Sequence, residues 1–331
     1  MKTKNMLEPK ISVVIPTHNR AFCVGEAIES CLKQASPETE VIVVDDGSTD
    51  ETPKVLNRFG DRIRVIRQRN SGVSAARNAG IIAAYGDWIL PLDSDDELIE
   101  GALEHFELIL RTAPEIIAIG GDVLLKGIGQ DRSLFSVRNF RVEQPFGLFT
   151  NPLRLVLTVQ FFTSGTVVSR SAALAAGVFD TGMSLYEDGD FHARLALQGP
   201  WGVTPRLVAL VVRKGMREEA LSFQHRQDPT ATPRARTKIF AKLLATDQLS
   251  AEDRPWVRLQ YGHALLSWVE ADLQTHGVLG THLVRRAIRA SHNPRLLAKA
   301  ALFWLLGRQG VALMEKARRM RKRDEFRRSD V

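Results

Sequence analysis

Three carboxylates stand within four residues at Asp93-Ser94-Asp95-Asp96, directly after the apolar run Trp88–Leu92. Neighbouring carboxylates repel one another and raise each other's pKa, and a divalent cation removes that repulsion. An Asp-X-Asp at a strand end offers hard oxygen ligands to Mg²⁺ or Mn²⁺ and leaves coordination positions for phosphates. A solvated turn before a helix N-terminus would also favour acids. The motif alone therefore leaves a metal site and a capped turn both open.

Two further polar clusters follow apolar runs in the same way. Pro16–Arg20 follows the β-branched run Ile11–Ile15, and Asp45–Asp50 follows Glu40–Val44. Apolar residues at helical spacing separate these runs, for example over Val24–Leu32. Alternating strands and helices predict an α/β fold with a mostly parallel sheet flanked by helices. Ligands bind such sheets at the carboxyl ends of the strands, so we expect the three clusters to share one edge.

The middle of the chain gives weaker patterns. We expect a helix from Leu98 to Leu110, then a strand over 115–125 with a turn at Gly120-Gly121. Residues 126–155 carry scattered glycines and prolines and predict an irregular segment. Residues 156–169 predict a strand that Thr163-Ser164-Gly165 interrupts.

The pattern changes after the apolar run Pro205–Arg213, because no strand is predicted beyond it. We expect a polar tail over 1–9, an α/β domain over 10–217 and a helical C-terminal extension over 218–331. The helices of that extension are predicted at roughly 234–246, 252–273, 278–291 and 295–320.

Composition limits the class of protein. The 331 residues are 44% apolar and 25% charged, which is ordinary for a globular chain. Cys23 and Cys31 are too few for a disulfide framework, so we interpret them as reduced core thiols. The apolar run at 11–15 is too short for a signal sequence, and no uncharged run reaches membrane-spanning length. These features predict a cytoplasmic protein.

Basic residues concentrate at the C-terminal end. Residues 281–331 hold fourteen Lys or Arg and four Asp or Glu, although the whole chain has a net charge of only +7. On a helix over 295–320, Phe303, Leu306 and Leu313 would share one side. Such a basic amphipathic tail predicts peripheral binding to an anionic membrane surface at its inner face. The alternative is a helix packed on the catalytic domain, and no motif favours nucleic acid.

Five motifs in order resemble the family 2 glycosyltransferases, inverting nucleotide-sugar enzymes with the GT-A fold, over about residues 10–215. The motifs are Ile11–Arg20, Val43–Asp50, Asn70-Ser71-Gly72 with Ala76-Arg77-Asn78, Asp93–Asp96, and Gly177–Asp180 with Glu187–Asp190.

The resemblance implies metal-assisted transfer of a sugar from a nucleoside-diphosphate sugar, usually a UDP-sugar, to a hydroxyl group of a glycan or lipid-linked acceptor. The product would be a surface polysaccharide, lipopolysaccharide or glycolipid. Asp46 would accept a hydrogen bond from the base, Arg77 would face the diphosphate, and Asp95 with Asp93 would hold Mg²⁺ or Mn²⁺. The implied nucleotide contacts are Pro16, Thr17, His18, Arg20, Asp46, Gly72, Arg77 and Asp93.

The resemblance makes Asp188 the general base. The attacking hydroxyl loses its proton as the new bond forms, so a carboxylate is needed within about 3 Å on the face opposite the leaving group. One displacement needs no second nucleophile and inverts the configuration. Glu187 would support or position this site.

Two departures from the family pattern stand out. The His that often follows the last strand is missing, which leaves Arg213, Lys214 or the more distant His225 to contact the diphosphate. Gly189 replaces a common aromatic, and Trp201 or Tyr186 could supply the platform for the acceptor sugar instead.

Three other classes remain as alternatives. A catalytically impaired homologue that binds nucleotide sugars or glycans would keep the fold, and the missing His leaves it open. A sugar-nucleotide nucleotidyltransferase would need a Gly-rich phosphate loop after the first strand, and Pro16–Arg20 is not Gly-rich. A dehydrogenase would need Gly-X-Gly-X-X-Gly at that place, which the sequence lacks.

Overall fold

A computed structural model describes residues 10–127, 130–212, 228–291 and 293–316 of the chain. The chain divides into two compact units, Met1–Met216 and Arg217–Val331. We refer to them as the N-terminal and the C-terminal unit.

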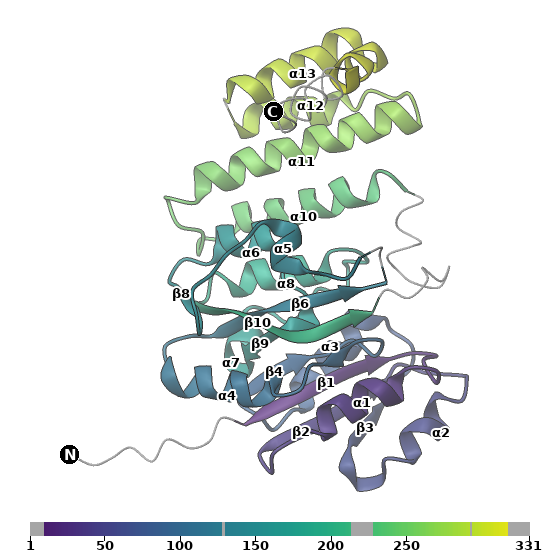
Figure 1. The fold of residues 1–331 in the computed structure, drawn as a ribbon. Helices are drawn as coiled ribbons and strands as arrows, with labels where there is room; N and C mark the ends of the chain where they lie inside the picture. The colour runs from purple at the N-terminus through teal and green to yellow at the C-terminus, as the bar shows by residue number, and fades with distance from the viewer. Residues whose placement is uncertain (1–9, 128–129, 213–227, 292, 317–331) are drawn as a thin grey trace, which may run out of the picture. The chain divides into compact units, whose positions relative to one another are not determined.

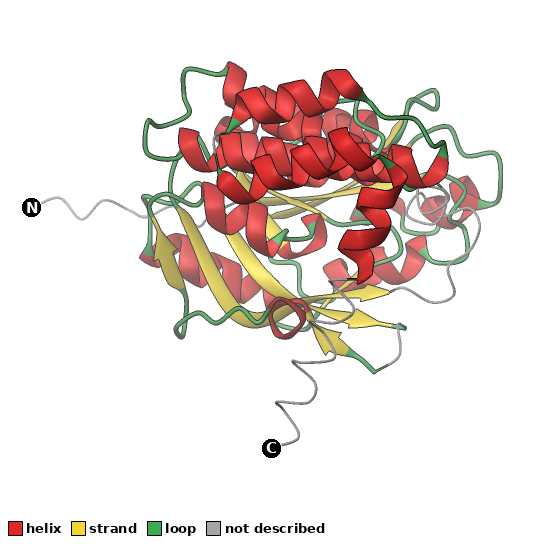
Figure 2. Ribbon diagram, turned by 90° about the horizontal axis from the view of Figure 1, so that it is seen from above, coloured by secondary structure: helices red, strands yellow, loops and turns green. Residues whose placement is uncertain are grey.

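The described strands of the N-terminal unit form one twisted sheet, which Figure 2 shows from above. Its order is β3-β2-β1-β4-β9-β6-β10-β5, with β7 beside β6 and β8 beside β10. The first four strands run parallel, whereas β9 runs antiparallel to both of its neighbours. The strands are β1 Ile11–Thr17, β2 Thr39–Asp45, β3 Arg64–Arg67, β4 Trp88–Pro91, β5 Glu97–Leu98, β6 Ala118–Lys126, β7 Arg132–Ser133, β8 Gly147–Phe149, β9 Thr166–Ser169 and β10 Trp201–Val212.

Helices cover both faces of the parallel half of the sheet. Helices α1 (Val24–Leu32) and α2 (Thr52–Asn57) lie on one face, and α3 (Val73–Ala83) lies on the other (Figure 1). The apolar positions of α1 are buried as their helical spacing predicted. Helix α3 approaches β1 closely at Gly80, where a Cβ atom would lie 2.2 Å from a methyl carbon of Val14. The mostly parallel α/β fold is thereby confirmed.

The remaining helical segments of this unit are shorter on average, and all but η1 follow β5. They are η1 Gly60–Arg62, α4 Ala102–Thr112, α5 Leu134–Arg138, α6 Leu153–Val159, η2 Thr163–Gly165, α7 Arg170–Ala175 and α8 Glu187–Leu195.

Several expectations for the middle of the chain are wrong. Gly120 and Gly121 lie inside β6 and form no turn, because their missing side chains leave room for the ring of Phe161 and for Val208. Leu98 belongs to β5, and α4 begins only at Ala102. The segment 126–155 is not wholly irregular, since it contains α5 and β8, and residues 156–159 belong to α6.

The C-terminal unit is helical in its described residues, with α10 (Ala231–Ala245), α11 (Arg254–Thr275), α12 (Thr281–Ala290) and α13 (Pro294–Leu306). The single helix expected over 295–320 is wrong, because α13 ends at Gly307, whose φ is 49°. Helical residues resume at 308–316. No helix in the described part of the chain has the length and apolar character needed to cross a membrane.

Candidate active site

The strand register brings the three predicted polar clusters to one edge of the sheet. Thr17 at the end of β1 pairs with Asp45 at the end of β2. On the other side of β1, Val14 pairs with Pro91, and the amide of Leu92 donates to the carbonyl of Val14 at 2.9 Å. The turns that begin at residues 18, 46 and 93 therefore leave the sheet at the same edge.

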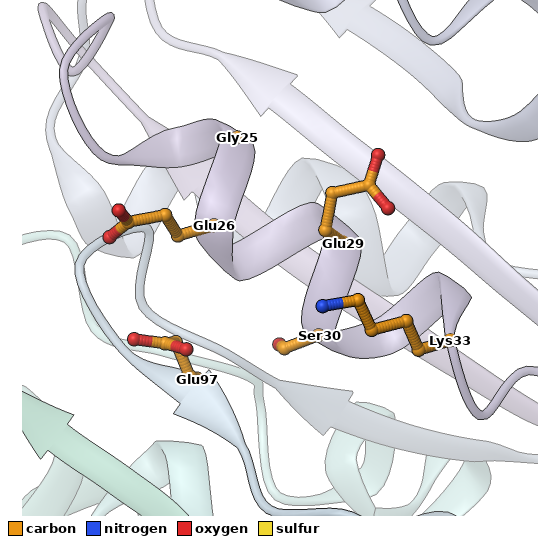
Figure 3. A pocket seen from close by; sticks show the side chains of 6 residues that line it. All are labelled: Gly25, Glu26, Glu29, Ser30, Lys33 and Glu97. Carbon is orange, nitrogen blue, oxygen red and sulfur yellow. The ribbon is translucent and has the colours of Figure 1, made fainter.

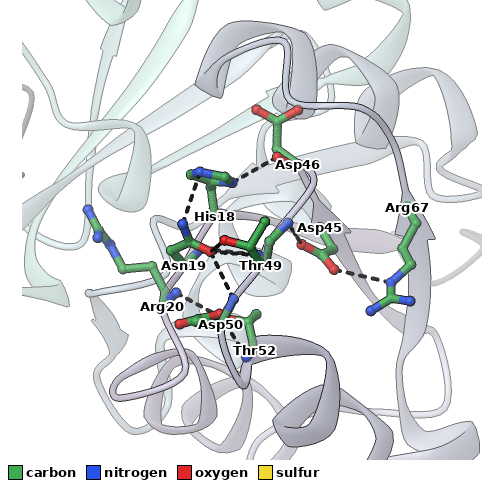
Figure 4. Close-up of polar contacts among 10 residues, drawn as sticks. His18, Asn19, Arg20, Asp45, Asp46, Thr49, Asp50, Thr52 and Arg67 are labelled. Carbon is green, nitrogen blue, oxygen red and sulfur yellow. Dashed lines mark hydrogen bonds and ion pairs between the residues drawn. The ribbon is translucent and has the colours of Figure 1, made fainter.

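His18 joins the first two turns (Figure 4). Its Nδ1 lies 2.9 Å from the carbonyl oxygen of Asp46, which can only accept a hydrogen bond. Its Nε2 lies 3.1 Å from the amide nitrogen of Asn70 and 3.3 Å from that of Asn19. The Nδ1–H therefore donates to the carbonyl of Asp46, and Nε2 faces the two side-chain amide groups. Both ring nitrogens of His18 are thus used within the protein, which leaves the face of the ring for a ligand.

The Asn19 side chain fixes the second turn. Its Oδ1 accepts hydrogen bonds from the backbone amides of Thr49 at 2.8 Å and Asp50 at 3.3 Å (Figure 4). The amide of Arg20 donates to Thr52 Oγ1 at 2.9 Å. The Asn19 side chain therefore holds the turn after β2, and Thr52 at the start of α2 holds the turn after β1.

Asp46 is buried and holds the segment that enters α3. Its Oδ1 accepts from Gln68 Nε2 at 2.7 Å and from the Ser71 amide at 2.9 Å, and its Oδ2 accepts from the Gly72 amide at 2.8 Å. Gly72 has a φ of 89°, which favours glycine. A carboxylate has about four acceptor sites, so Asp46 keeps capacity for one further donor.

A second polar group at this edge lacks a partner. Thr17 Oγ1 is buried and has no hydrogen-bond partner among the described residues. Buried hydroxyl groups are normally satisfied. The free acceptor capacity of Asp46 and the orphaned hydroxyl of Thr17 therefore fit a polar ligand at the predicted nucleotide side.

Arg77 was predicted to face the diphosphate of the donor. In the structure its side chain lies buried between two carboxylates. Its Nη2 lies 2.5 Å from Asp93 Oδ1 and its Nη1 lies 3.1 Å from Glu187 Oε1. Burial lowers the pKa of Arg77, but the charges of Asp93 and Glu187 outweigh it and raise the pKa above its usual value. Both terminal nitrogens of the guanidinium bind carboxylates, and the predicted contact between Arg77 and a diphosphate stays a prediction.

The loop after β4 alternates between outward and inward side chains. Asp93 is half-buried and Asp95 is exposed, whereas Ser94 and Asp96 are buried. The first two are the acids predicted to hold a metal, and they are the two that solvent or a ligand can reach.

Asp96 anchors this loop from within. Its Oδ2 accepts from Ser164 Oγ at 2.6 Å, and its Oδ1 accepts from the Val212 amide at 3.2 Å. The same Ser164 oxygen accepts from the Asp93 amide at 3.2 Å. Burial and the charges of Asp93 and Asp95 raise the pKa of Asp96 well above its ordinary value. Ser164 was not among the predicted site residues, although the polar triplet Thr163-Ser164-Gly165 inside an apolar run was a usable signal.

The residues at this loop fit a divalent cation. Among the described residues, no group of three or more ligating side chains gathers in one place. Mg²⁺ commonly uses only one or two carboxylates and completes its shell with water and substrate phosphates. The accessible oxygens of Asp93 and Asp95 match that donor set.

Asp188 stands in the first turn of α8, next to Glu187, the residue that pairs with Arg77. Its Oδ1 accepts from the Gly189 amide at 2.6 Å. Burial, the neighbouring charge of Glu187 and the more distant Asp93 raise the pKa of Asp188 to about 7, against the lowering influence of Arg77. A carboxyl group with a pKa near neutrality can take up a proton and release it again.

The segment before α8 is strained and firmly held. Val178 has a φ of 49°, which is an outlier for a β-branched residue. Asn78 of α3 bonds both backbone groups of Phe179, at 2.9 Å to the amide and 2.8 Å to the carbonyl. The Phe179 ring stacks on Phe191 at 4.2 Å and carries the Arg77 guanidinium at 5.1 Å. This packing positions Arg77 and the start of α8 together.

Other expected groups lie elsewhere. Trp201 is fully buried in β10, so it cannot serve as an acceptor platform, whereas Tyr186 is half-buried before α8. Arg213, Lys214 and His225 fall outside the described residues.

A hollow of about 290 Å³ between α1 and β5 contains none of the predicted site residues. Acidic side chains dominate its lining, and nothing further there indicates a ligand. The residues that line it are Gly25, Glu26, Glu29, Ser30, Lys33 and Glu97 (Figure 3).

The comparisons with known proteins agree on one family. The sequence model described as Glycosyl transferase family 2 matches residues 12–164. A PGL/p-HBAD biosynthesis glycosyltransferase of Mycobacterium tuberculosis is 30% identical over 238 residues, which cover 63% of this chain and 92% of that protein. Other relatives match over shorter stretches, and the chain spans only 16% to 40% of the first three. One of these is Glycosyltransferase GlyG of Streptococcus pneumoniae, 42% identical over 33% of this chain and 38% of its own.

Two solved structures share the fold. S. aureus TarS has a TM-score of 0.69 at 18% identity over 94% of this chain and 91% of its own, and TarS has also been solved with UDP-GlcNAc. The mannosyltransferase PcManGT from Pyrobaculum calidifontis, solved with GDP-Man and Mn²⁺, has a TM-score of 0.54 at 18% identity, over 95% of this chain and 81% of that chain.

Proposed function

The chain belongs to glycosyl transferase family 2, and from this premise we propose that it transfers a sugar from a nucleoside-diphosphate sugar to a hydroxyl group with inversion. One observation carries the proposal. Arg77 binds both Asp93, at the predicted donor side, and Glu187, next to the predicted base. This link supports one connected site for the groups proposed to stabilise the leaving group and to remove the proton.

The donor is proposed to be a UDP-sugar whose base lies against the turn Pro16–Arg20. The remaining acceptor capacity of Asp46 suits the N3–H of uracil, and the orphaned Thr17 hydroxyl offers a further contact. Gly72 leaves open space beside its backbone, since a Cβ atom there would meet nothing within 4 Å. The complexes of TarS with UDP-GlcNAc and UDP support this choice of base.

Asp95, with Asp93, is proposed to hold Mg²⁺ or Mn²⁺ beside the diphosphate. A bound divalent cation would supply charge neutralisation for the departing phosphate. Asp95 would face the cation, while hydrogen bonds from Arg77 to the Asp93 carboxylate and from the Asp93 amide to Ser164 hold Asp93 in place.

Asp188 is proposed to take the proton of the attacking hydroxyl. Its raised pKa places its basic form in the neutral range, and a transferred proton is then accepted on a carboxylate oxygen. Glu187 stays paired with Arg77 and positions the first turn of α8. The acceptor is proposed to be a glycan or a lipid-linked saccharide of a surface polysaccharide or glycolipid.

A screen of nucleotide sugars tests these roles. We expect UDP or a UDP-sugar to raise the melting temperature more strongly with Mn²⁺ than without it, and the matching donor to be hydrolysed slowly. Asp95→Asn should remove the metal-dependent part of the shift, whereas Asp61→Asn at an exposed acid in η1 should keep it. Binding that is indifferent to metal would overturn the metal assignment. Donor binding without any turnover would favour the catalytically impaired homologue.

A further inference from the structure

The last helices of the described chain expose an apolar strip. Leu305 is 77% exposed, and its neighbours Trp304 and Leu306 are 43% and 41% exposed. Three consecutive large apolar side chains at a helix end are unusual on a surface that meets only water. The core-facing positions of α13 are different residues, since Leu296, Ala300 and Phe303 are fully buried. The exposed residues of the strip therefore do not belong to the side of α13 that packs in the core.

Cations lie beside this strip on the neighbouring helix. Arg285, Ile288 and Arg289 follow one another at helical spacing on the exposed side of α12. The Arg285 guanidinium lies 5.6 Å from the centre of the Trp304 ring, which joins this side of α12 to the strip on α13. We name Arg285, Ile288, Arg289, Trp304 and Leu305 the basic–apolar face.

The charged residues of the segment that forms this face are almost all basic. Residues 281–316 contain seven Lys or Arg and a single acid, Glu315. Glu315 bonds Gln274 and therefore lies against α11. Two copies of such a face would bring like charges together, which opposes self-association. An anionic partner that also accepts apolar side chains satisfies both features of the face.

We propose that the basic–apolar face docks the C-terminal unit on an anionic phospholipid surface. Trp304 and Leu305 would enter the boundary between headgroups and acyl chains, while Arg285 and Arg289 would bind lipid phosphates. Arginine on a neighbouring helix keeps its charged end at headgroup level when its stem lies along apolar surface.

This docking surface differs from the one that the amphipathic pattern predicted. Phe303 was expected to share one side of a long helix with Leu306 and Leu313, but Phe303 is buried, Leu306 and Leu313 are exposed, and the break at Gly307 ends that helix. The inference goes beyond the proposed transfer reaction and does not depend on it. Membrane contact would bring the enzyme to lipid-linked acceptors if the reaction is as proposed.

Vesicle sedimentation of the full chain tests the docking. We expect binding to vesicles of phosphatidylcholine mixed with phosphatidylglycerol, much weaker binding to phosphatidylcholine alone, and loss of affinity as salt rises. Leu305→Ser should weaken the binding roughly tenfold by removing an exposed apolar side chain that the membrane would bury. The double variant Arg285→Gln with Arg289→Gln should weaken it by about 25-fold, at about fivefold for each cation near an anionic surface.

Matched controls separate the face from general surface effects. Ile82→Ser removes an apolar side chain that is 61% exposed on α3, and Arg58→Gln with Arg132→Gln removes two exposed cations of the N-terminal unit. Both controls should bind vesicles as the unchanged protein does. Asp95→Asn should also bind normally, so a failure of the catalytic proposal would leave this result standing.

Three outcomes would overturn the proposal. Equal binding to neutral and anionic vesicles would remove the role of the arginines. A dimer in ultracentrifugation that Leu305→Ser dissociates would make a second copy the occupant. Binding of RNA that competes with vesicles and is indifferent to Leu305→Ser would assign the basic patch to nucleic acid.

Discussion

Arg77 and Asp93 form a hydrogen-bonded ion pair with 2.5 Å between Nη2 and Oδ1, and Arg77 is 4% exposed. The two residues come from α3 and from the loop after β4, so the pair fixes the predicted metal loop to a helix on the opposite face of the sheet from α1. Because Arg77 also binds Glu187, one buried cation sets the distance between the two acidic segments.

Replacement of Arg77 by Met should destabilise the protein strongly. The change leaves Asp93 and Glu187 without their counter-ion, and breaking a buried pair in this way costs about 3–5 kcal/mol. Urea denaturation measures the free energy of unfolding. Lys54→Met breaks the exposed pair with Glu51 and should cost less than about 1 kcal/mol. Similar losses in both variants would contradict the buried bridge.

Activity should depend on the protonation of Asp188. Its pKa of about 7 predicts that kcat/KM rises about tenfold per pH unit below pH 7 and levels off above it. Asp188→Asn should lower kcat by at least about a hundredfold and abolish this acid limb. Asp180→Asn removes a carboxylate from the same segment outside α8 and should keep the limb. An unchanged pH profile in Asp188→Asn would exclude Asp188 as the base.

The ionisation of Asp188 should also affect the stability of the protein, which should fall with rising pH while activity rises. The folded-state pKa of Asp188 lies above the ordinary value of 3.8, so between 3.8 and about 7 the folded state binds more protons than the unfolded state. The free energy of unfolding therefore falls as pH rises through this window. Asp188→Asn cannot ionise and should be more stable than the unchanged protein at pH 8 but not at pH 4. Thermal unfolding at the two pH values measures the difference.

The sequence predicted the inner parallel strands well because β1, β2 and β4 are largely buried on both faces, unlike the edge strand β3. Such strands are continuous runs of β-branched residues, as in Ile11–Ile15, and each ends in a polar cluster that cannot continue the run. Topology then places those clusters at one edge without any further information. The acids at 46, 93 and 95 were predicted as site residues for this reason.

Long-range packing explains what the sequence did not reveal. Gly120-Gly121 has the composition of a turn, but Phe161 and Val208 occupy the space that side chains would need, and those neighbours are distant in the chain. Ser164 bonds Asp96 across 68 positions, a contact that no local pattern encodes. The true partners of Arg77 were hidden likewise, because Glu187 lies 110 positions away.

Val178→Asn should stabilise the protein slightly. Val178 adopts a left-handed conformation with φ of 49°, which costs an ordinary side chain about 1–2 kcal/mol and costs asparagine less. Loss of half-buried apolar contacts offsets part of that gain, so we expect about 0.5 kcal/mol. The reverse exchange, Asn139→Val at an exposed residue with φ of 50°, should destabilise by about 1 kcal/mol. Stabilities that move in the same direction would contradict the assigned strain.

Ser164→Ala should separate metal affinity from nucleotide-base binding. The hydroxyl accepts from the Asp93 amide and donates to Asp96, so its loss leaves two buried groups unsatisfied and costs about 1–3 kcal/mol of stability. The loop that carries Asp93 and Asp95 then loses its inner support, and we expect the Mn²⁺ concentration for half-maximal activity to rise several-fold. Asp46 and its partners are untouched, so UDP binding without metal should stay the same. Thr158→Ala removes an exposed hydroxyl that bonds only its own helix and serves as the control. A merely structural role for Ser164 would lower stability and leave the Mn²⁺ requirement where it was.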